Sequence, residues 1–103
     1  MTIQHYTVRS NRQRPRIWIE GARLLSAGFT HHTPYTVEIV KDSLYLIRCA
    51  KGAPKGARKV AGAPARPIID ITGKSCAPFK TGDAVEIHYI EGGVIIISPE
   101  GKS

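Results

Sequence analysis

Apolar and polar residues along this chain alternate in short blocks of strand length. Ile17 and Ile19 alternate with Arg16 and Trp18 directly after a proline, and the longest unbroken apolar runs, such as residues 94–97, span only a few positions. Period-two alternation over such lengths predicts half-buried β-strands. The pattern therefore predicts a mainly β protein.

An internal repeat divides the chain into two similar units. Residues 14–21 match residues 66–73 at five of eight positions, including an Arg-Pro pair and a closing glycine. The matched segments follow in the same order in both copies: 14–21 with 66–73, 27–29 with 77–79, 37–39 with 85–87, and 44–47 with 94–97. A repeat shorter than a domain implies that its copies share one core.

Each unit is expected to contain a proline-led strand, a glycine break, a short helix or turn, and a β-hairpin. In the first unit, residues 21–29 have leucine and alanine at helical spacing, with Gly28 as the C-terminal stop. In the second unit, Pro78 limits the equivalent stretch to a single turn. The hairpins are expected to turn at residues 41–43 and 91–93.

The domain organisation follows from how little each unit can bury. A unit of about 35 residues cannot bury its apolar face alone, so residues 1–103 are expected to form a single domain. The first unit spans residues 6–48 and the second spans residues 66–98. Residues 49–65 consist mainly of glycine, alanine, proline and cations. They are interpreted as a basic, flexible linker.

Composition narrows the class of protein. Hydrophobic residues make up 42% of the 103 residues, which indicates a chain that folds. No stretch approaches the roughly 20 apolar residues of a membrane-spanning helix, and the N-terminus has no secretory signal pattern. We therefore expect a cytoplasmic protein without membrane contacts. Cys49 and Cys76 are expected to be reduced packing residues.

The positive charge is concentrated in two segments. The net charge is +7, and residues 1–19 and 43–69 hold four and six of the fifteen cations, while all eight acids lie elsewhere. A solubility role would not require this segregation. Two acid-free basic segments favour an anionic partner, and nucleic acid is the first expectation.

The repeated segments carry a resemblance to known families. Residues 15–29, followed by the segments 37–39 and 44–47, resemble the SymE-type toxins of bacterial type I toxin-antitoxin systems. The second unit, around residues 82–87, is similar to the broader AbrB/MazE swapped-hairpin class. The chain departs from the SymE pattern at Arg23, where the family has an aromatic residue.

The resemblance implies both a fold and a function. It implies a swapped-hairpin β-barrel formed by two tandem ββ-hairpin units, with a short helix in the first. It also implies a nucleoid-associated toxin that binds DNA through a basic surface and needs no cofactor. The alternatives are an endoribonuclease toxin that holds and cleaves mRNA, and an AbrB-type transcription regulator or antitoxin. A homodimer of such pseudo-dimeric barrels is a further expectation.

Candidate site residues come from the two basic segments and their surroundings. The binding set consists of Arg9, Arg12, Arg14, Arg16, Trp18, Arg23, Lys55, Arg58, Lys59, Arg66 and Lys74. Trp18 shares a strand face with Arg16, so it is either a stacking platform for bases or the cap of a second core face. His31 and His32 are weak candidates for acid-base catalysis. No cluster of His, Cys and Asp has the spacing of a metal site.

Overall fold

The computed structural model describes residues 2–49 and 51–101. Strands make up most of these residues, so the prediction of a mainly β protein is confirmed. The strands are β1 (Thr2–Thr7), β2 (Arg9–Asn11), β3 (Arg14–Glu20), β4 (Pro34–Val40), β5 (Ser43–Arg48), β6 (Arg58–Lys59), β7 (Ala61–Ala63), β8 (Arg66–Thr72), β9 (Ala84–Ile90) and β10 (Val94–Pro99). The helix α1 (Ala22–Ser26) and the 3₁₀ turn η1 (Gly73–Cys76) follow β3 and β8.

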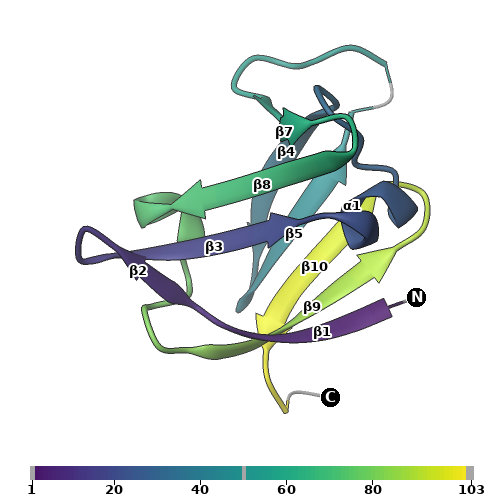
Figure 1. The fold of residues 1–103 in the computed structure, drawn as a ribbon. Coiled ribbons are helices and arrows are strands. Elements are labelled where there is room, and N and C mark those ends of the chain that lie inside the picture. The colour runs from purple at the N-terminus through teal and green to yellow at the C-terminus, as the bar shows by residue number, and fades with distance from the viewer. Residues whose placement is uncertain (1, 50, 102–103) are drawn as a thin grey trace.

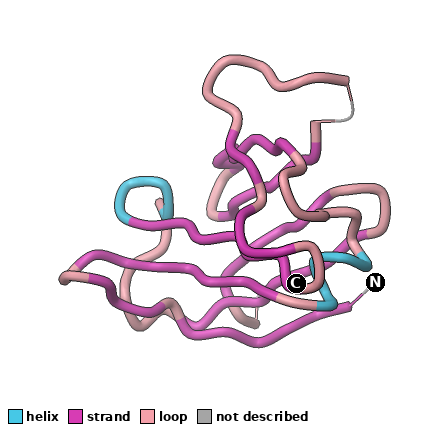
Figure 2. The backbone as a smooth tube through the Cα atoms, turned by 45° about the horizontal axis from the view of Figure 1, so that its top comes forward, coloured by secondary structure: helices cyan, strands magenta, loops and turns pink. Residues whose placement is uncertain are grey.

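The strands of the described residues form two antiparallel sheets. The larger sheet has the order β1-β9-β10-β5-β4-β6, and the smaller sheet has the order β2-β3-β8-β7. Figure 1 shows β3 and β8 crossing in front of β4 and β5. Figure 2 shows that strands make up most of the backbone, with the two helical elements at opposite ends of the molecule.

The core lies between the inner faces of the two sheets. Side chains alternate along each strand, so every second residue points inward. The inward residues that are at most 2% exposed include Ile17, Ile19, Ile69 and Ile71 of the smaller sheet and Leu44, Leu46, Val85, Ile87, Ile95 and Ile97 of the larger sheet. No polar or charged residue is buried among the described residues. Hydrophobic burial on both inner faces therefore holds the sheets together.

The two units interlace. In the smaller sheet, β3 pairs with its repeat counterpart β8, and in the larger sheet β5 pairs with its counterpart β10. The strands that lead into the two units also cross over, because β1 pairs with the second hairpin at β9 and β6 pairs with the first hairpin at β4. Neither unit has a sheet or a core of its own.

Two buried valines carry the chain from one sheet to the other. Val8 lies between β1 and β2, and Val60 occupies the same position between β6 and β7; both are at most 1% exposed. The Val8 N–H donates to the Asp83 carbonyl at 2.9 Å, and the Val60 N–H donates to the Thr33 carbonyl at 3.0 Å. These matching bonds hold both crossings in the same way.

The interpretation of residues 49–65 as a flexible linker is wrong for its second half. Residues 58–59 form β6 and residues 61–63 form β7. The sequence concealed this structure, because β6 is an Arg-Lys pair, β7 contains only alanine and glycine, and the only large apolar side chain in the two strands and their connection is Val60. Residues 51–57 remain without a strand, and Ala57 donates to the Pro54 carbonyl in a turn at 3.1 Å.

The alignment of the two hairpins differs from the one that the sequence indicated. The identical Val-Glu-Ile segments had matched residues 37–39 with residues 85–87. Buried Phe29 and Phe79 are equivalent, as the sequence comparison indicated. Tyr35 lies six residues after Phe29, and Val85 lies six residues after Phe79. Tyr35 pairs with Arg58 of β6, and Val85 pairs with the equivalent residue Tyr6 of β1. The counterpart of Val85 is therefore Tyr35, and the recurrence of Val-Glu-Ile is a coincidence.

The two outer edges of the larger sheet are unequal. All six residues of β1 pair with β9, whereas β6 pairs only with Pro34 and Tyr35 at the start of β4. The turn at residues 54–57 comes directly before β6, so the chain reaches β4 only at Arg58 and leaves the rest of β4 without a partner on this side. Ile39 and Val40 are 56% and 42% exposed as a result.

Local geometry explains the helical elements. Gly21 and Gly73 end β3 and β8 with φ values of 92° and 64°, in the region that favours glycine. Leu24 in α1 and Cys76 in η1 then enter the core with no exposed surface. The predictions of a short helix in the first unit and of a single turn in the second are confirmed. Cys76 and the half-buried Cys49 are both free thiols.

Candidate nucleic-acid interface

The outer face of the smaller sheet carries five of the eleven predicted binding residues. Since Ile17, Ile19, Ile69 and Ile71 point inward, the residues between them point outward. Cross-strand neighbours share a face, so the register extends this set to β2 and β7. The outward residues are Arg9, Asn11, Arg14, Arg16, Trp18, Glu20, Ala61, Ala63, Arg66, Ile68, Asp70 and Thr72.

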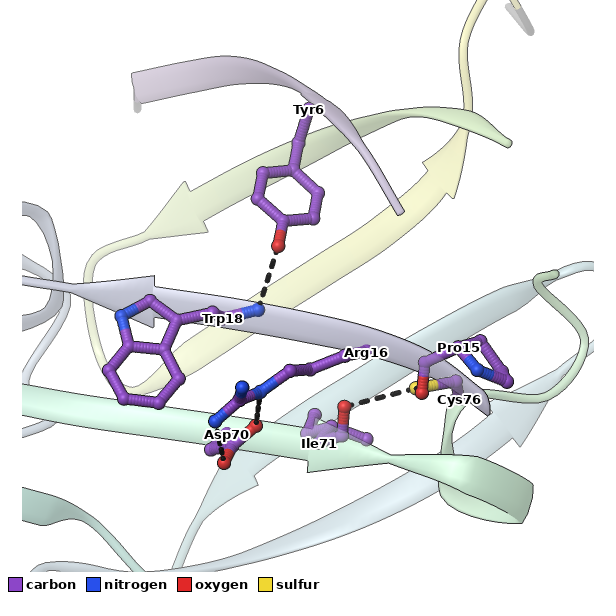
Figure 3. A network of polar contacts seen from close by, with 7 residues as sticks. All are labelled: Tyr6, Pro15, Arg16, Trp18, Asp70, Ile71 and Cys76. Atoms are coloured by element: carbon purple, nitrogen blue, oxygen red, sulfur yellow. Dashed lines mark hydrogen bonds and ion pairs between the residues drawn. The ribbon is translucent and has the colours of Figure 1, made fainter. Parts of the chain in front are cut away.

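Arg16 is held by an acid from the other unit. Its Nε and Nη2 atoms donate to the two carboxylate oxygens of Asp70, both at 2.9 Å, and its guanidinium lies 4.6 Å from the Trp18 ring centroid (Figure 3). The hydrogen bonds to Asp70 raise the pKa of Arg16. A bidentate pair occupies the fork that would otherwise hold a phosphate. Arg16 therefore orients Trp18 and is removed from the set of free cations.

Trp18 is half-buried on this outward face. Its backbone N–H donates to the Tyr6 hydroxyl at 2.9 Å (Figure 3). Its ring lies outside the core, beneath the Arg16 guanidinium, because its strand neighbours Ile17 and Ile19 fill the inner face. This placement agrees with a solvent-side ring rather than with the cap of a second core.

Arg66 is also paired. Its Nη2 donates to Glu20 Oε1 at 2.9 Å, and its side chain is 70% exposed. The hydrogen bond from Arg66, together with one from Trp18, lowers the pKa of the Glu20 carboxyl. Both acids of this face are thus engaged with arginines of the face.

Three further cations gather at one end of the smaller sheet. A hollow lined by Asn11, Arg12, Arg14 and Thr72 adjoins a second hollow lined by Gln13, Arg14, Pro15, Thr72, Gly73 and Lys74. None of Arg12, Arg14 and Lys74 forms an ion pair with a carboxylate of the described residues. We call Arg12, Arg14 and Lys74 the basic end.

The local backbone explains why the basic end forms. Arg12 and Gln13 connect β2 to β3 with φ values of 54° and 67°, the geometry of a tight two-residue hairpin turn. This turn projects the Arg12 and Arg14 side chains at the tip. Figure 1 shows η1 at the same end of the molecule as the turn, which brings Lys74 beside them. At Gly73 a Cβ atom would stand 3.6 Å from the Arg14 guanidinium, so Arg14 passes over this glycine.

A third hollow combines aromatic rings and cations. Its lining includes Tyr6, Arg9, Trp18 and Arg23, together with Glu20. The Arg9 guanidinium lies 5.6 Å from the Tyr6 ring centroid. β2 joins the two regions, because Arg9 and Asn11 point outward from the same strand. We call this region the aromatic hollow.

The remaining candidates lie elsewhere or serve the fold. Arg58 donates through Nη2 to the Ser75 hydroxyl, so it ties β6 to η1. Lys59 is exposed on β6, and Lys55 lies in the segment 51–57 that projects from the body away from the β2–β3 turn (Figures 1 and 2). The structure therefore brings Arg12, Arg14 and Lys74 together at the basic end, and Arg9 and Arg23 together at the aromatic hollow. The cations of the predicted linker join neither group.

His31 and His32 stack on each other with ring centroids 3.7 Å apart. His32 has a φ of 70°, and the loop is closed by a 2.7 Å hydrogen bond between the Thr30 and Thr33 hydroxyls. No described carboxylate forms an ion pair with either ring. The described residues also include no group of three or more metal-ligating side chains.

The contribution of Asp70 was missed from the sequence, although the repeat contained a signal for it. Trp18 and Asp70 occupy equivalent positions in the two units, and they lie directly opposite each other where β3 pairs with β8. When a pseudo-twofold axis relates two neighbouring antiparallel strands, equivalent residues of the two strands lie opposite each other at the axis. Arg16 lies two residues before Trp18 on the same face, within reach of Asp70.

Comparisons with known proteins provide no relative. No protein-family model, curated protein or solved structure matches this chain. Within residues 2–49 and 51–101, no helix has both the length and the apolar character needed to cross a membrane.

Proposed function

We propose that the protein binds nucleic acid, with duplex DNA as its first target, through the basic end and the adjoining aromatic hollow. The observation that carries this proposal is the gathering of Arg12, Arg14 and Lys74 around Thr72, while both acids of the same face are paired with other arginines. Cations without acidic partners attract a polyanion and release its counterions.

The shape of the basic end favours duplex DNA. Arg12 and Arg14 lie at the tip of a two-stranded antiparallel ribbon formed by β2 and β3. The major groove admits such a ribbon, and an arginine fork can bond phosphate oxygens or the O6 and N7 edge of guanine. The aromatic hollow adds ring faces at Tyr6 and Trp18, which can stack on an unpaired base.

The pairing of the strands supports a swapped-hairpin barrel of the AbrB/MazE type as the fold behind this activity. Support comes from the exchange of the strands that lead into the two units, with β1 on the second hairpin and β6 on the first. The proposed role as a SymE-like toxin of a bacterial toxin-antitoxin system rests on the resemblance of residues 15–29 and the segments that follow. DNA binding is the part of that role for which the geometry supplies residues.

A side-by-side titration of duplex DNA and RNA tests the proposal. Gel shifts with the full chain are expected to show binding that is strongest for duplex DNA and that is lost in the triple variant R12A/R14A/K74A. The variant K51A/K55A/K59A removes the same charge from the distant segment and serves as the matched control. We expect it to retain most of the affinity.

The same samples separate binding from catalysis. If the labelled RNA is cut by the wild type and not by a folded H31A/H32A variant, the protein is a ribonuclease and the proposal is wrong. Equal weakening by the two triple variants would instead mean that net charge, and not the basic end, governs binding.

A further inference from the structure

The outer face of the larger sheet has a chemistry of its own. The buried side chains Leu44, Leu46, Ile95 and Ile97 point inward, so the residues between them point away from the core. The outward residues of its five longer strands are Ile3, His5, Thr7, Pro34, Thr36, Glu38, Val40, Ser43, Tyr45, Ile47, Ala84, Glu86, His88, Ile90, Val94, Ile96 and Ser98. We call this surface the cation-free face, because these residues include no lysine or arginine.

The middle of the cation-free face is apolar. Tyr45 and Ile47 of β5 lie directly opposite Ile96 and Val94 of β10, and all four side chains are partly exposed. Ile3 and Val40, farther out on β1 and β4, are 46% and 42% exposed. Exposed apolar residues that gather across several strands are typical of an interaction site.

The charge distribution identifies the occupant. The chain carries fifteen cations and a net charge of +7, which opposes association of two copies through surfaces that carry cations. The cation-free face spans five strands, and Lys59 of β6, which pairs with Pro34, lies at its edge. Two copies can therefore meet across the middle of this face without bringing cations together. Its carboxylates are Glu38 and Glu86, and Glu86 Oε1 lies 3.2 Å from His88 Nε2. With two carboxylates and no lysine or arginine, the face does not favour an anionic ligand.

The order of residues across the sheet makes the face complementary to itself. One row runs from His88 through Ile96 and Tyr45 to Glu38, on β9, β10, β5 and β4. A twofold axis parallel to the strands, between β5 and β10, places β4 of one copy over β9 of the other. Glu38 then faces His88 of the second copy, and Tyr45 faces Ile96.

We propose that two copies of the chain associate through their cation-free faces, in a twofold sheet-on-sheet dimer. Aligned sheets pack about 10 Å apart with interdigitated side chains, which suits the branched residues at the centre. The dimer leaves both basic ends outward. This inference does not depend on nucleic-acid binding, because the cation-free face and the basic end lie on different sheets.

Sedimentation velocity of the nuclease-treated full chain over roughly 1–200 µM tests the dimer, since micromolar association is typical of a modest interface. We expect a concentration-dependent dimer in the wild type. Ile96→Lys is expected to raise the dissociation constant by at least about tenfold, because it puts a cation into the centre of the face. Ile68→Lys, the same change on the outer face of the smaller sheet, is the matched control and should leave association unchanged.

A second variant keeps the test decisive if the lysine disturbs folding. The pair Ile47→Thr and Val94→Thr retains strand-forming residues and is also expected to weaken the dimer by about tenfold. Wild-type protein that sediments as a monomer over the whole range would overturn the proposal. Equal effects of Ile96→Lys and Ile68→Lys in folded proteins would do the same.

Cross-linking tests the orientation. The double variant carries Glu38→Cys and His88→Cys in a Cys49→Ser background. Within one chain its two new thiols are separated by the strands β5 and β10. In the proposed dimer, each new thiol faces the other kind of thiol on the second copy. A short bifunctional maleimide should link two copies of the double variant far more efficiently than either single variant. Equal cross-linking by the single variants would contradict this arrangement.

Discussion

The two sheets have similar inner faces and different outer faces. Both sheets turn isoleucine, leucine and valine inward. On its outer face the smaller sheet carries Arg9, Arg14, Arg16 and Arg66 with two acids. The outward positions of the five longer strands of the larger sheet include no lysine or arginine. The inward positions specify the fold, and the outward positions are free to specify partners. The difference separates a surface suited to a polyanion from one suited to a second copy.

The largest expected effect separates inward from outward positions on a single strand. Ile95 has no exposed surface, and its neighbour Ile96 points outward. Ile95→Ala should lower the free energy of unfolding by about 2–5 kcal/mol through lost burial and a cavity. Ile96→Ala should lower it by less than about 1.5 kcal/mol. Urea denaturation at low micromolar protein concentration measures both, and similar losses would contradict the assignment of faces.

Removing Asp70 should sharpen the difference between the two outer faces. Asp70→Ala frees the Arg16 guanidinium from its bidentate pair and takes one negative charge from the smaller sheet. We expect duplex DNA affinity at low salt to rise about three- to tenfold, with one additional phosphate contact. Fluorescence anisotropy measures the change. Asp70→Ala combined with Arg16→Ala is the control, and it should return the affinity to the wild-type value or below.

The smallest expected effect is a pH dependence from Glu20. Because Arg66 holds the pKa of Glu20 below its ordinary value of 4.5, the folded state binds this proton less readily than the unfolded state. The stability from ionised Glu20 is therefore present above pH 4.5 and is lost as pH falls through the lowered pKa. Wild type should exceed Glu20→Gln in stability at about pH 6, and the difference should vanish in more acidic solution.

Thermal melts across this pH range, repeated in an Arg66→Ala background, test the cause. Arg66→Ala should remove most of the stability difference that Glu20→Gln produces near neutral pH. A difference that persists unchanged without Arg66 would show that another group lowers the pKa.

Much of the fold was predictable from sequence, because strong local signals coincide with the elements that form. The Arg-Pro starts at residues 14 and 66, the glycines 21 and 73 and the buried Phe29 and Phe79 all marked real equivalences. β7 escaped prediction because alanine and glycine have little strand propensity of their own, and β6 because it is only the pair Arg58 and Lys59. β6 forms because its backbone pairs with Pro34 and Tyr35 of β4, far away in sequence, and β7 forms because it pairs with β8 across a short turn.

The candidate site was less predictable because charge along the sequence does not reveal which cations are paired in space. Arg16 and Arg66 belong to the basic segments, but acids 54 and 46 residues away bind them. Lys74 belongs to neither segment and reaches the basic end only through the pairing of β3 with β8. Long-range strand pairing decides both outcomes.

The salt dependence of duplex DNA affinity tests the central claim most directly. If Arg9, Arg12, Arg14, Arg23 and Lys74 each contact a phosphate, log affinity should fall against log salt with a slope of about −4 to −5. R12A/R14A/K74A should reduce the steepness by about two to three units, and K51A/K55A/K59A should leave it nearly unchanged. A flat response in the wild type, or equal changes in both folded triple variants, would contradict nucleic-acid binding through the basic end.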